Sequence, residues 1–255
     1  MILVTHTVKL KQKQNMRTKI LLASAAALAA GMLGSSAQVY SANVVGYANV
    51  VLKGNGQFTL VSDPFSDSNG NIVSNIVNSA LPGGVANPLG QSKITYLVSG
   101  APTTIVKGAS GAWNVNPSLP PGTGFFVQNG KPGGNAPDVT NTFVGTVAVN
   151  SGGSITNDIP VGFSLQGSVI PYAGNIAIAS TSGGDTNLNY GGALSSPDIN
   201  HRSSITYWNV VGQAPVTALK GIAGNWNGTV FVNVADGFYL YNPNTDTKVV
   251  QNATY

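Results

Sequence analysis

The 255-residue sequence contains no cysteine and no glutamate, and only 8% of its residues are charged. Without cysteine the chain is not a disulfide-stapled domain, and cysteine-ligated zinc and iron–sulfur sites are excluded. The lack of Glu removes a strong helix former, which argues against a helical protein. Intrinsic disorder is also disfavoured, because high charge is missing and 42% of the residues are hydrophobic.

The basic residues are concentrated at the start of the chain. Five of the 12 Lys and Arg residues precede an apolar run from Ile20 to Leu33, which small residues follow. This order is the pattern of a secretory signal peptide, and the run is shorter than the about 20 residues of a membrane-spanning helix. We predict a signal peptide over residues 1–37, cut after Ala37. Cleavage after Ala42 is the alternative, and Met16 is an alternative start.

Removal of this leader changes the charge balance. The full sequence has a formal charge of +4, but without the leader seven basic residues face eight Asp, a balance of −1. The remaining basic residues are scattered, so nucleic acid is not an expected partner. No second apolar run of membrane length follows, so no transmembrane segment is expected after leader removal. We therefore expect a secreted protein, extracellular or at the cell surface.

The rest of the chain contains an internal repeat. Residues 92–129 and 203–242 share an Ile-Thr-Tyr segment and Ala-Pro, Lys-Gly, Trp-Asn and Gly-Phe pairs, and from Ala101 onward the offset is constant at 113. Such self-similarity indicates tandem copies of one unit. We predict two homologous units, 38–150 and 151–255, each of ordinary domain size.

Most of both units has the pattern of short strands. Alternating β-branched and aromatic residues, as in 94–98 and 142–149, are separated by clusters of Gly, Pro and Asn. Repeated short strands favour a sandwich. One exception is Asn71–Leu81, whose four-residue apolar spacing predicts a helix that stops at Pro82. The predicted fold class is all-β, with two tandem homologous β-sandwich-like units and one short helix in the first.

Two motifs of the first unit resemble a family of exported bacterial β-domains. Gly56–Phe65 is similar to the family's Gly-aromatic-x-Leu-(Ile/Val)-x-(Asn/Asp)-Pro opening, with the aromatic residue displaced by one. Leu119–Val127, followed by Thr142–Gly145, is similar to its Leu-x-Pro-Gly-x-Gly-Phe-Phe-Val and Thr-Phe-x-Gly patterns. Such domains are common in the Verrucomicrobia–Planctomycetes group, and related ones occur in large surface proteins of Bacteroidetes. The resemblance implies a β-domain of uncharacterised function without a known active site.

This resemblance is weaker in the second unit, where Val234-Ala235-Asp236 replaces the Pro-Pro-Gly turn. The residues that catalysis requires are also scarce. Beyond the leader the only histidine is His201, there is no Gly-x-Ser-x-Gly elbow, and the carboxylates are scattered Asp residues. Nucleophilic catalysis needs a positioned base, and glycoside hydrolysis needs two paired carboxylates. The sequence therefore predicts a protein that is not an enzyme.

Two loops carry oxygen-bearing side chains at alternate positions, the spacing of the first ligands of a calcium loop. These residues are Asp67, Asn69 and Asn71 in the first loop and Asp185, Asn187 and Asn189 in the second. Against calcium, Asn78 stands where the first loop would need a bidentate Glu. Asp and Asn also favour turns that bind no metal. A calcium site and a metal-free turn are thus both open interpretations, and no other cofactor is expected.

Three tryptophans are candidates for ligand binding. Trp113 and Trp226 hold equivalent repeat positions beside Asn, and Trp208 lies in the second unit. Exposed aromatic rings stack on sugars, whereas buried ones anchor domain cores. The sequence as a whole predicts an exported, non-enzymatic structural or adhesive protein. Its expected partners are extracellular or cell-surface macromolecules, polysaccharide or further copies of itself, and the alternative is a carbohydrate-binding module.

Overall fold

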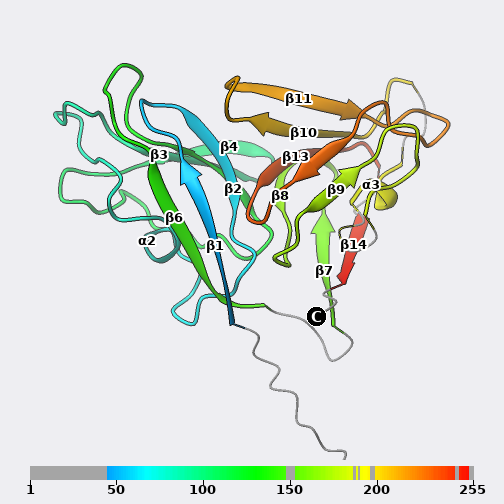
Figure 1. Cartoon of the computed structure of the whole chain (residues 1–255), viewed down its shortest axis with the longest axis horizontal. Helices are drawn as coiled ribbons and strands as arrows, with labels where there is room; N and C mark the ends of the chain where they lie inside the picture. The colour runs from blue at the N-terminus through cyan, green and yellow to red at the C-terminus, as the bar shows by residue number, and fades with distance from the viewer. Residues whose placement is uncertain are drawn as a thin grey trace, which may run out of the picture. The chain divides into compact units, whose positions relative to one another are not determined.

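The computed structural model describes residues 45–147, 153–185, 188, 190–195, 199–244 and 247–252. The predicted leader, both cleavage sites, Met16 and the boundary between the predicted units lie outside the described residues. The described part is mostly β, which confirms the all-β prediction (Figure 1). Within it, no helix has the length and apolar character that crossing a membrane requires.

The elements follow one another in a similar order in the two parts of the chain. We call residues 45–147 the N-terminal half and residues 153–252 the C-terminal half. The N-terminal half contains β1 (Val45–Leu52), β2 (Phe58–Ser62), α2 (Val73–Ile76), β3 (Lys93–Val98), β4 (Ala101–Val106), β5 (Gly124–Gln128) and β6 (Val139–Thr146). The C-terminal half contains β7 (Ser154–Ile159), β8 (Gly162–Gly167), β9 (Gly174–Ala177), α3 (Tyr190–Ala193), β10 (Ser204–Asn209), β11 (Ala214–Leu219), β12 (Val230–Val232), β13 (Gly237–Asn242) and β14 (Thr247–Asn252).

Each half is built around a four-stranded antiparallel sheet. The order is β2-β5-β3-β4 in the N-terminal half and β8-β13-β10-β11 in the C-terminal half, so each strand has a counterpart in the same place. The ribbons β1-β6 and β7-β14 also correspond, and β9-β12 is an additional pair. A duplicated unit would have this shared order. That the halves are homologous domains stays a prediction, and residues Ala42–Tyr255 form one compact unit.

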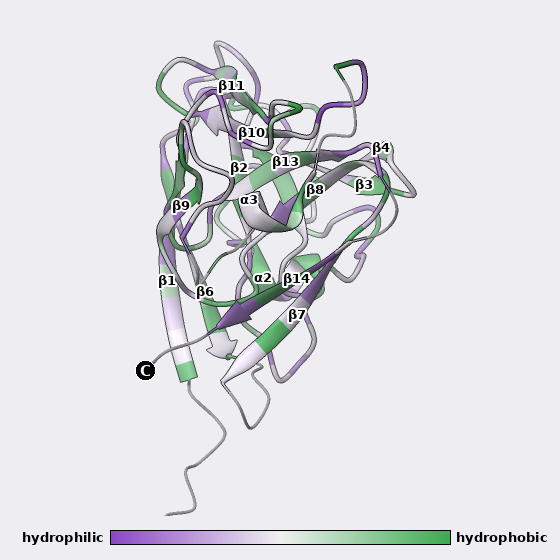
Figure 2. Ribbon diagram, turned by 90° about the vertical axis from the view of Figure 1, so that its right-hand side faces the viewer, coloured by the Kyte–Doolittle hydropathy of each residue, from purple (hydrophilic) through white to green (hydrophobic). Residues whose placement is uncertain are grey.

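Alternation of side chains gives each half its own core. Burial alternates along β6 and β14, as expected for strands with one face turned inward. Figure 2 shows hydrophobic and hydrophilic residues interspersed along the strands. Phe65, Phe125 and Phe143 lie in the core of the N-terminal half. Tyr190 and Phe238 lie in the core of the C-terminal half. Each such buried ring stabilises its half by about 1.5–3 kcal/mol relative to an exposed one.

The helix predicted over Asn71–Leu81 is a single turn, α2, which ends where Val77 becomes extended (φ −111°, ψ 130°). Side-chain amides replace the helical hydrogen bonds beyond it. Asn78 N donates to Asn141 Oδ1 at 2.7 Å, and Ala80 N donates to Asn78 Oδ1 at 2.8 Å. Such bonds compete with the helix for backbone groups. The C-terminal half contains a second single turn, α3, that the sequence does not predict.

The two halves meet through matching contacts. In β2, Ser62 N donates to Ala235 O at 2.9 Å, and in β8, Gly167 N donates to Gly122 O at 2.9 Å. Ser62 and Gly167 hold the same place in corresponding strands, as do Gly122 and Ala235 in corresponding turns. The contact is therefore approximately twofold symmetric, like the isologous interface of a homodimer.

The turns at this contact have the same backbone form despite different sequences. Gly122 has φ 84° and Ala235 has φ 68°, so both lie in the left-handed region. Glycine adopts this region freely, whereas alanine does so at a cost of about 1–2 kcal/mol. The geometry of the contact thus persists where Val234-Ala235-Asp236 replaces the Pro-Pro-Gly turn.

Close approach of β2 and β8 leaves no room for a side chain at Gly167. A Cβ atom there would fall on the Cβ and Oγ atoms of Ser62. Ser62 is fully buried, and its Cβ is held by the backbone of β2, so it cannot move aside. At this point one strand must carry glycine because the other carries serine.

We expect Gly167→Ala to destabilise the protein by about 1–3 kcal/mol, the usual cost of overpacking a buried contact. Chemical denaturation measures it. Gly183→Ala is the matched control, because a Cβ at Gly183 would meet its nearest neighbour, Gly192 Cα, at an ordinary 3.8 Å. Equal stability of the two variants would show that the β2–β8 contact is not tight.

A buried carboxyl follows β2. Asp63 is 1% exposed, accepts a hydrogen bond from Phe65 N at 2.9 Å and accepts another from Asn71 Nδ2 at 2.9 Å. Burial raises its pKa to about 7, because desolvation outweighs the two hydrogen bonds, which lower the pKa, and the nearby Asp67 charge raises it further. The folded protein therefore holds a proton that the unfolded chain releases near pH 4.

The free energy of unfolding should fall as the pH rises from about 4 through about 7, because the folded state binds the extra proton over this window. Asp63→Asn, which is neutral at every pH, should reduce the total change in the free energy of unfolding over this pH window by up to roughly 4 kcal/mol. Burial also raises the pKa of Asp236, so part of the slope remains. Denaturation curves at a series of pH values test this, with the exposed Asp158→Asn as control. An unchanged slope in Asp63→Asn would contradict the assignment.

Candidate functional site

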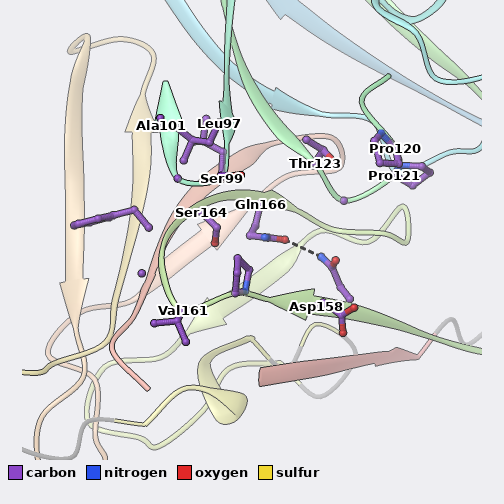
Figure 3. A pocket seen from close by; sticks show the side chains of 17 residues that line it. Leu97, Ser99, Ala101, Pro120, Pro121, Thr123, Asp158, Val161, Ser164 and Gln166 are labelled. Atoms are coloured by element: carbon purple, nitrogen blue, oxygen red, sulfur yellow. Dashed lines mark hydrogen bonds between the residues drawn. The ribbon is translucent and has the colours of Figure 1, made fainter. Parts of the chain in front are cut away.

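A cleft of about 910 Å³ opens between the two halves (Figure 3). Three segments line it: the β3–β4 turn, the loop before β5, and the run from the end of β7 through β8. Their residues lie at 97, 99–101, 120–123, 157–158 and 160–166. The cleft is thus built from both halves, beside the close contact of β2 and β8.

The lining combines one exposed ring with neutral polar groups. Phe163 is 62% exposed, and its ring centroid lies 4.6 Å from that of Tyr241 on the neighbouring strand. Asp158 is the single ionisable side chain of the lining. Its carboxylate lies 3.5 Å from Lys248 Nζ, and both side chains are 76% exposed. An apolar surface with a few oriented polar groups is the usual composition of a binding site.

Hydrogen bonds fix the amide groups at the floor of the cleft. Asn157 Nδ2 donates to Gln166 Oε1 at 3.0 Å, the bond drawn as a dashed line at Gln166 in Figure 3. It also donates to the hydroxyl of Tyr190 at 2.8 Å. Tyr190 is fully buried, and its hydroxyl donates to Gly167 O at 2.6 Å. Because Gln166 Oε1 accepts from Asn157, the Nε2 group of Gln166 remains a donor without a partner among the described residues.

The cleft exists because the two halves differ in one hairpin. In the C-terminal half, β10 and β11 are joined by the four residues 210–213. In the N-terminal half, β3 and β4 are joined by Ser99 and Gly100 alone, with φ 50° and 79°, values typical of a tight two-residue turn. Leu97 also takes the place of Trp208. The shorter, smaller hairpin therefore leaves Phe163 uncovered.

At the corresponding place on the other side the longer hairpin contacts Phe58, which is half-buried, and a smaller pocket of about 320 Å³ remains beside it. Phe58, the counterpart of Phe163, donates from N to Gln213 Oε1 at 2.8 Å. Its carbonyl accepts from Gln213 Nε2 at 3.2 Å and from Trp208 Nε1 at 3.0 Å. The Trp208 ring also packs edge-on against Phe58 and Phe126, at 6.3 and 5.4 Å between centroids. The longer hairpin thus closes over Phe58 with an indole ring and a side-chain amide.

The tryptophans highlighted by the sequence lie elsewhere. Trp226 is 2% exposed, and its Nε1 donates to Gly191 O at 3.3 Å, so it is a core side chain without an exposed face. Trp113 is half-buried against the core of the N-terminal half. Trp208 is half-buried at the contact between the halves. The three rings therefore do not form one exposed row for a sugar.

Each repeated tryptophan lies beside a buried lysine. Lys107 Nζ is 5.9 Å from the Trp113 ring centroid, and Lys220 Nζ is 5.6 Å from that of Trp226. Lys107 donates to two backbone carbonyls and Lys220 to three, all in the segments around α2 and α3. Burial lowers the pKa of both lysines. These lysines and tryptophans tie the helical segments to the sheets.

The first predicted calcium loop is a hydrogen-bonded turn. Asp67 Oδ1 accepts from Asn69 N at 2.7 Å, and Asn71 Oδ1 accepts from Asp67 N at 3.2 Å. Asn71 Nδ2 also donates to Phe65 O at 2.7 Å, so the Asn71 amide is engaged at both ends. Side-chain oxygens of both Asp67 and Asn71 thus already accept backbone hydrogen bonds within the turn.

The second predicted loop is described only at Asp185. The carboxylate Oδ2 of Asp185 accepts from Asn175 N at 2.7 Å, whereas Asn187 and Asn189 lie outside the described residues. Over the described ranges, no group of three or more His, Asp or Glu side chains is arranged to hold a metal ion.

We expect the melting temperature to be the same in excess calcium and in chelator, because the first loop's oxygens already accept hydrogen bonds. A calcium site would instead add about 2.7 kcal/mol to the free energy of unfolding when the calcium concentration is a hundred times its Kd. Asn71→Ala should lower the stability by about 1–3 kcal/mol in both buffers, since it leaves buried partners unpaired. A calcium-dependent rise that Asn71→Ala abolishes would establish a metal site.

Comparison with protein-family models, curated proteins and solved structures gives no match to this chain. The family resemblance drawn from the motifs therefore stays a prediction. Sequence reasoning did not single out Phe163, Asn157 or Gln166. A signal for the cleft was present, however: the repeat offset changes from 111 at Ile94 to 113 at Ala101, which places a two-residue difference in the hairpin.

Proposed function

We propose that the chain is an exported, non-enzymatic protein with a structural or adhesive role, and that it binds an extracellular or cell-surface macromolecule through the cleft at Phe163. The exposed Phe163 ring in a cleft of about 910 Å³ is the observation that carries this proposal. A concave surface that combines an apolar ring with a few oriented polar groups is the usual form of a binding site.

The composition of the cleft supports binding rather than catalysis. General acid–base chemistry needs titratable groups placed within reach of a substrate. The lining holds one, Asp158, which is exposed and lies near Lys248. Export is supported by the leader pattern of residues 1–37.

The mature chain, residues 38–255, should bind to envelopes and extracellular material from the producing cells. Phe163→Ala should weaken this binding about tenfold or more, since loss of a contacting ring costs at least about 1.4 kcal/mol. Phe231→Ala is the matched control, because Phe231 is 52% exposed on β12 outside the cleft. Binding that Phe163→Ala leaves intact would contradict the proposal. The proposal would also be contradicted if the protein were found in the cytoplasm with N-terminal peptides that still include residues 17–37.

A carbohydrate-binding module is the second candidate. The adjacent rings of Phe163 and Tyr241, with the amides of Asn157 and Gln166 nearby, offer a stacking surface beside hydrogen-bonding groups. A glycan array distinguishes the candidates: specific glycans that bind the mature chain and not Phe163→Ala would favour this module.

A further inference from the structure

We propose that the cleft binds a segment of another protein chain that presents an aromatic ring and a primary carboxamide, from Gln or Asn, to β8 at Phe163. This inference rests on the proposed binding function of the cleft and names its partner class. It follows from the counterpart of the cleft, where Gln213 and Trp208 hydrogen-bond to the backbone of Phe58 and the Trp208 ring packs against the Phe58 ring.

The backbone of Phe163 is directed like that of Phe58. β2 and β8 are the end strands of their sheets, each paired on one side only, with β5 and with β13. Along an antiparallel strand, alternate residues direct their N–H and C=O groups to the same side. Gly167 N donates away from β13, to Gly122 O, so Phe163, four residues earlier, directs its groups to that same open side. These groups face the cleft.

The shape of a carboxamide suits these two groups. Its oxygen and nitrogen are attached to one carbon and lie on the same side, so it accepts from the N–H and donates to the C=O of a single residue, as Gln213 does at Phe58. The N-acetyl group of an amino sugar is a trans secondary amide, with C=O and N–H on opposite sides. It cannot make both bonds to Phe163, which favours a protein segment over an amino sugar.

The cleft has the space and the polarity for such a segment. Leu97 and the Ser99–Gly100 turn occupy less volume than Trp208 and the 210–213 loop, and about 910 Å³ is left open. The Phe163 ring is available for edge-on packing, as Phe58 is used by Trp208. Gln166 Nε2 adds a donor for a carbonyl of the segment. Asp158 is the single ionisable side chain of the lining, so a neutral amide matches the site.

The probe is the chain's own covering hairpin, a cyclised synthetic peptide with the sequence of residues 206–217, labelled for fluorescence anisotropy. The mature chain should bind it, and Phe163→Ala should weaken binding tenfold or more, whereas Phe231→Ala should not. Peptides with the changes Gln213→Glu or Trp208→Ala should also bind at least tenfold more weakly, because each lacks one of the two groups. If the peptide does not bind to the mature chain, the proposal is overturned. Peptide binding that Phe163→Ala leaves unchanged also overturns it. The peptide would in that case be replacing the protein's own hairpin at Phe58.

A grafted chain tests the same complementarity within the whole protein. It carries Leu97→Trp and has Ser99–Gly100 replaced by the sequence of residues 210–213. The graft should raise the melting temperature and abolish peptide binding, because the cleft is then filled from within. A lower melting temperature with peptide binding intact counts against the proposal.

The envelope assay separates failure of this inference from failure of the proposed function. Phe163-dependent envelope binding that the peptide does not compete would leave the function standing and show that the partner is not a protein segment. Selective glycan binding on the array would then identify it as a carbohydrate. Envelope binding independent of Phe163 would overturn both proposals.

Discussion

The contact between β2 and β8 is the constraint on which the rest of the structure depends. Two strands approach so closely at Ser62 and Gly167 that only a hydrogen atom fits on one of them. Hydrogen bonds on either side, from Ser62 N to Ala235 O and from Gly167 N to Gly122 O, hold this distance. Because the arrangement is nearly symmetric, any difference between the halves appears as a difference between two matched surfaces. One of these surfaces is partly covered by the longer hairpin and the other is the cleft.

The difference between the two surfaces has a simple origin. An isologous contact presents two copies of every surface, and here the hairpins beside the two copies differ in length. The longer hairpin provides the cover at Phe58, with three hydrogen bonds to one residue's backbone. The shorter hairpin leaves Phe163 62% exposed, whereas its counterpart Phe58 is half-buried. An exposed ring beside polar groups in a concave surface is the physical reason for the proposed binding role.

Particular residues show which features of the fold and of the site can be predicted from the sequence. Alternating strand patterns predict the all-β class, since side-chain period depends only on local geometry. The helix over Asn71–Leu81 is overestimated because Asn78 and Asn141 capture its backbone groups, a contact between residues far apart in sequence. The repeated tryptophans suggest a ligand site, but burial of Trp226 depends on packing that no short motif encodes. Phe163 is exposed because the Ser99–Gly100 turn, far away in the sequence, is shorter than the 210–213 loop. No pattern in the residues around Phe163 indicates this exposure.

The difference in hairpin length has a consequence for how such a protein acquires partners. Hairpin tips lie beyond the strands they join and tolerate insertions better than the strands do. Two residues added or removed at one tip open or close a surface without disturbing the sheets or the β2–β8 contact. Exposure of this surface is thereby separated from folding stability. The framework can stay constant while the hairpin of β3 and β4 decides whether the surface at Phe163 is open or covered.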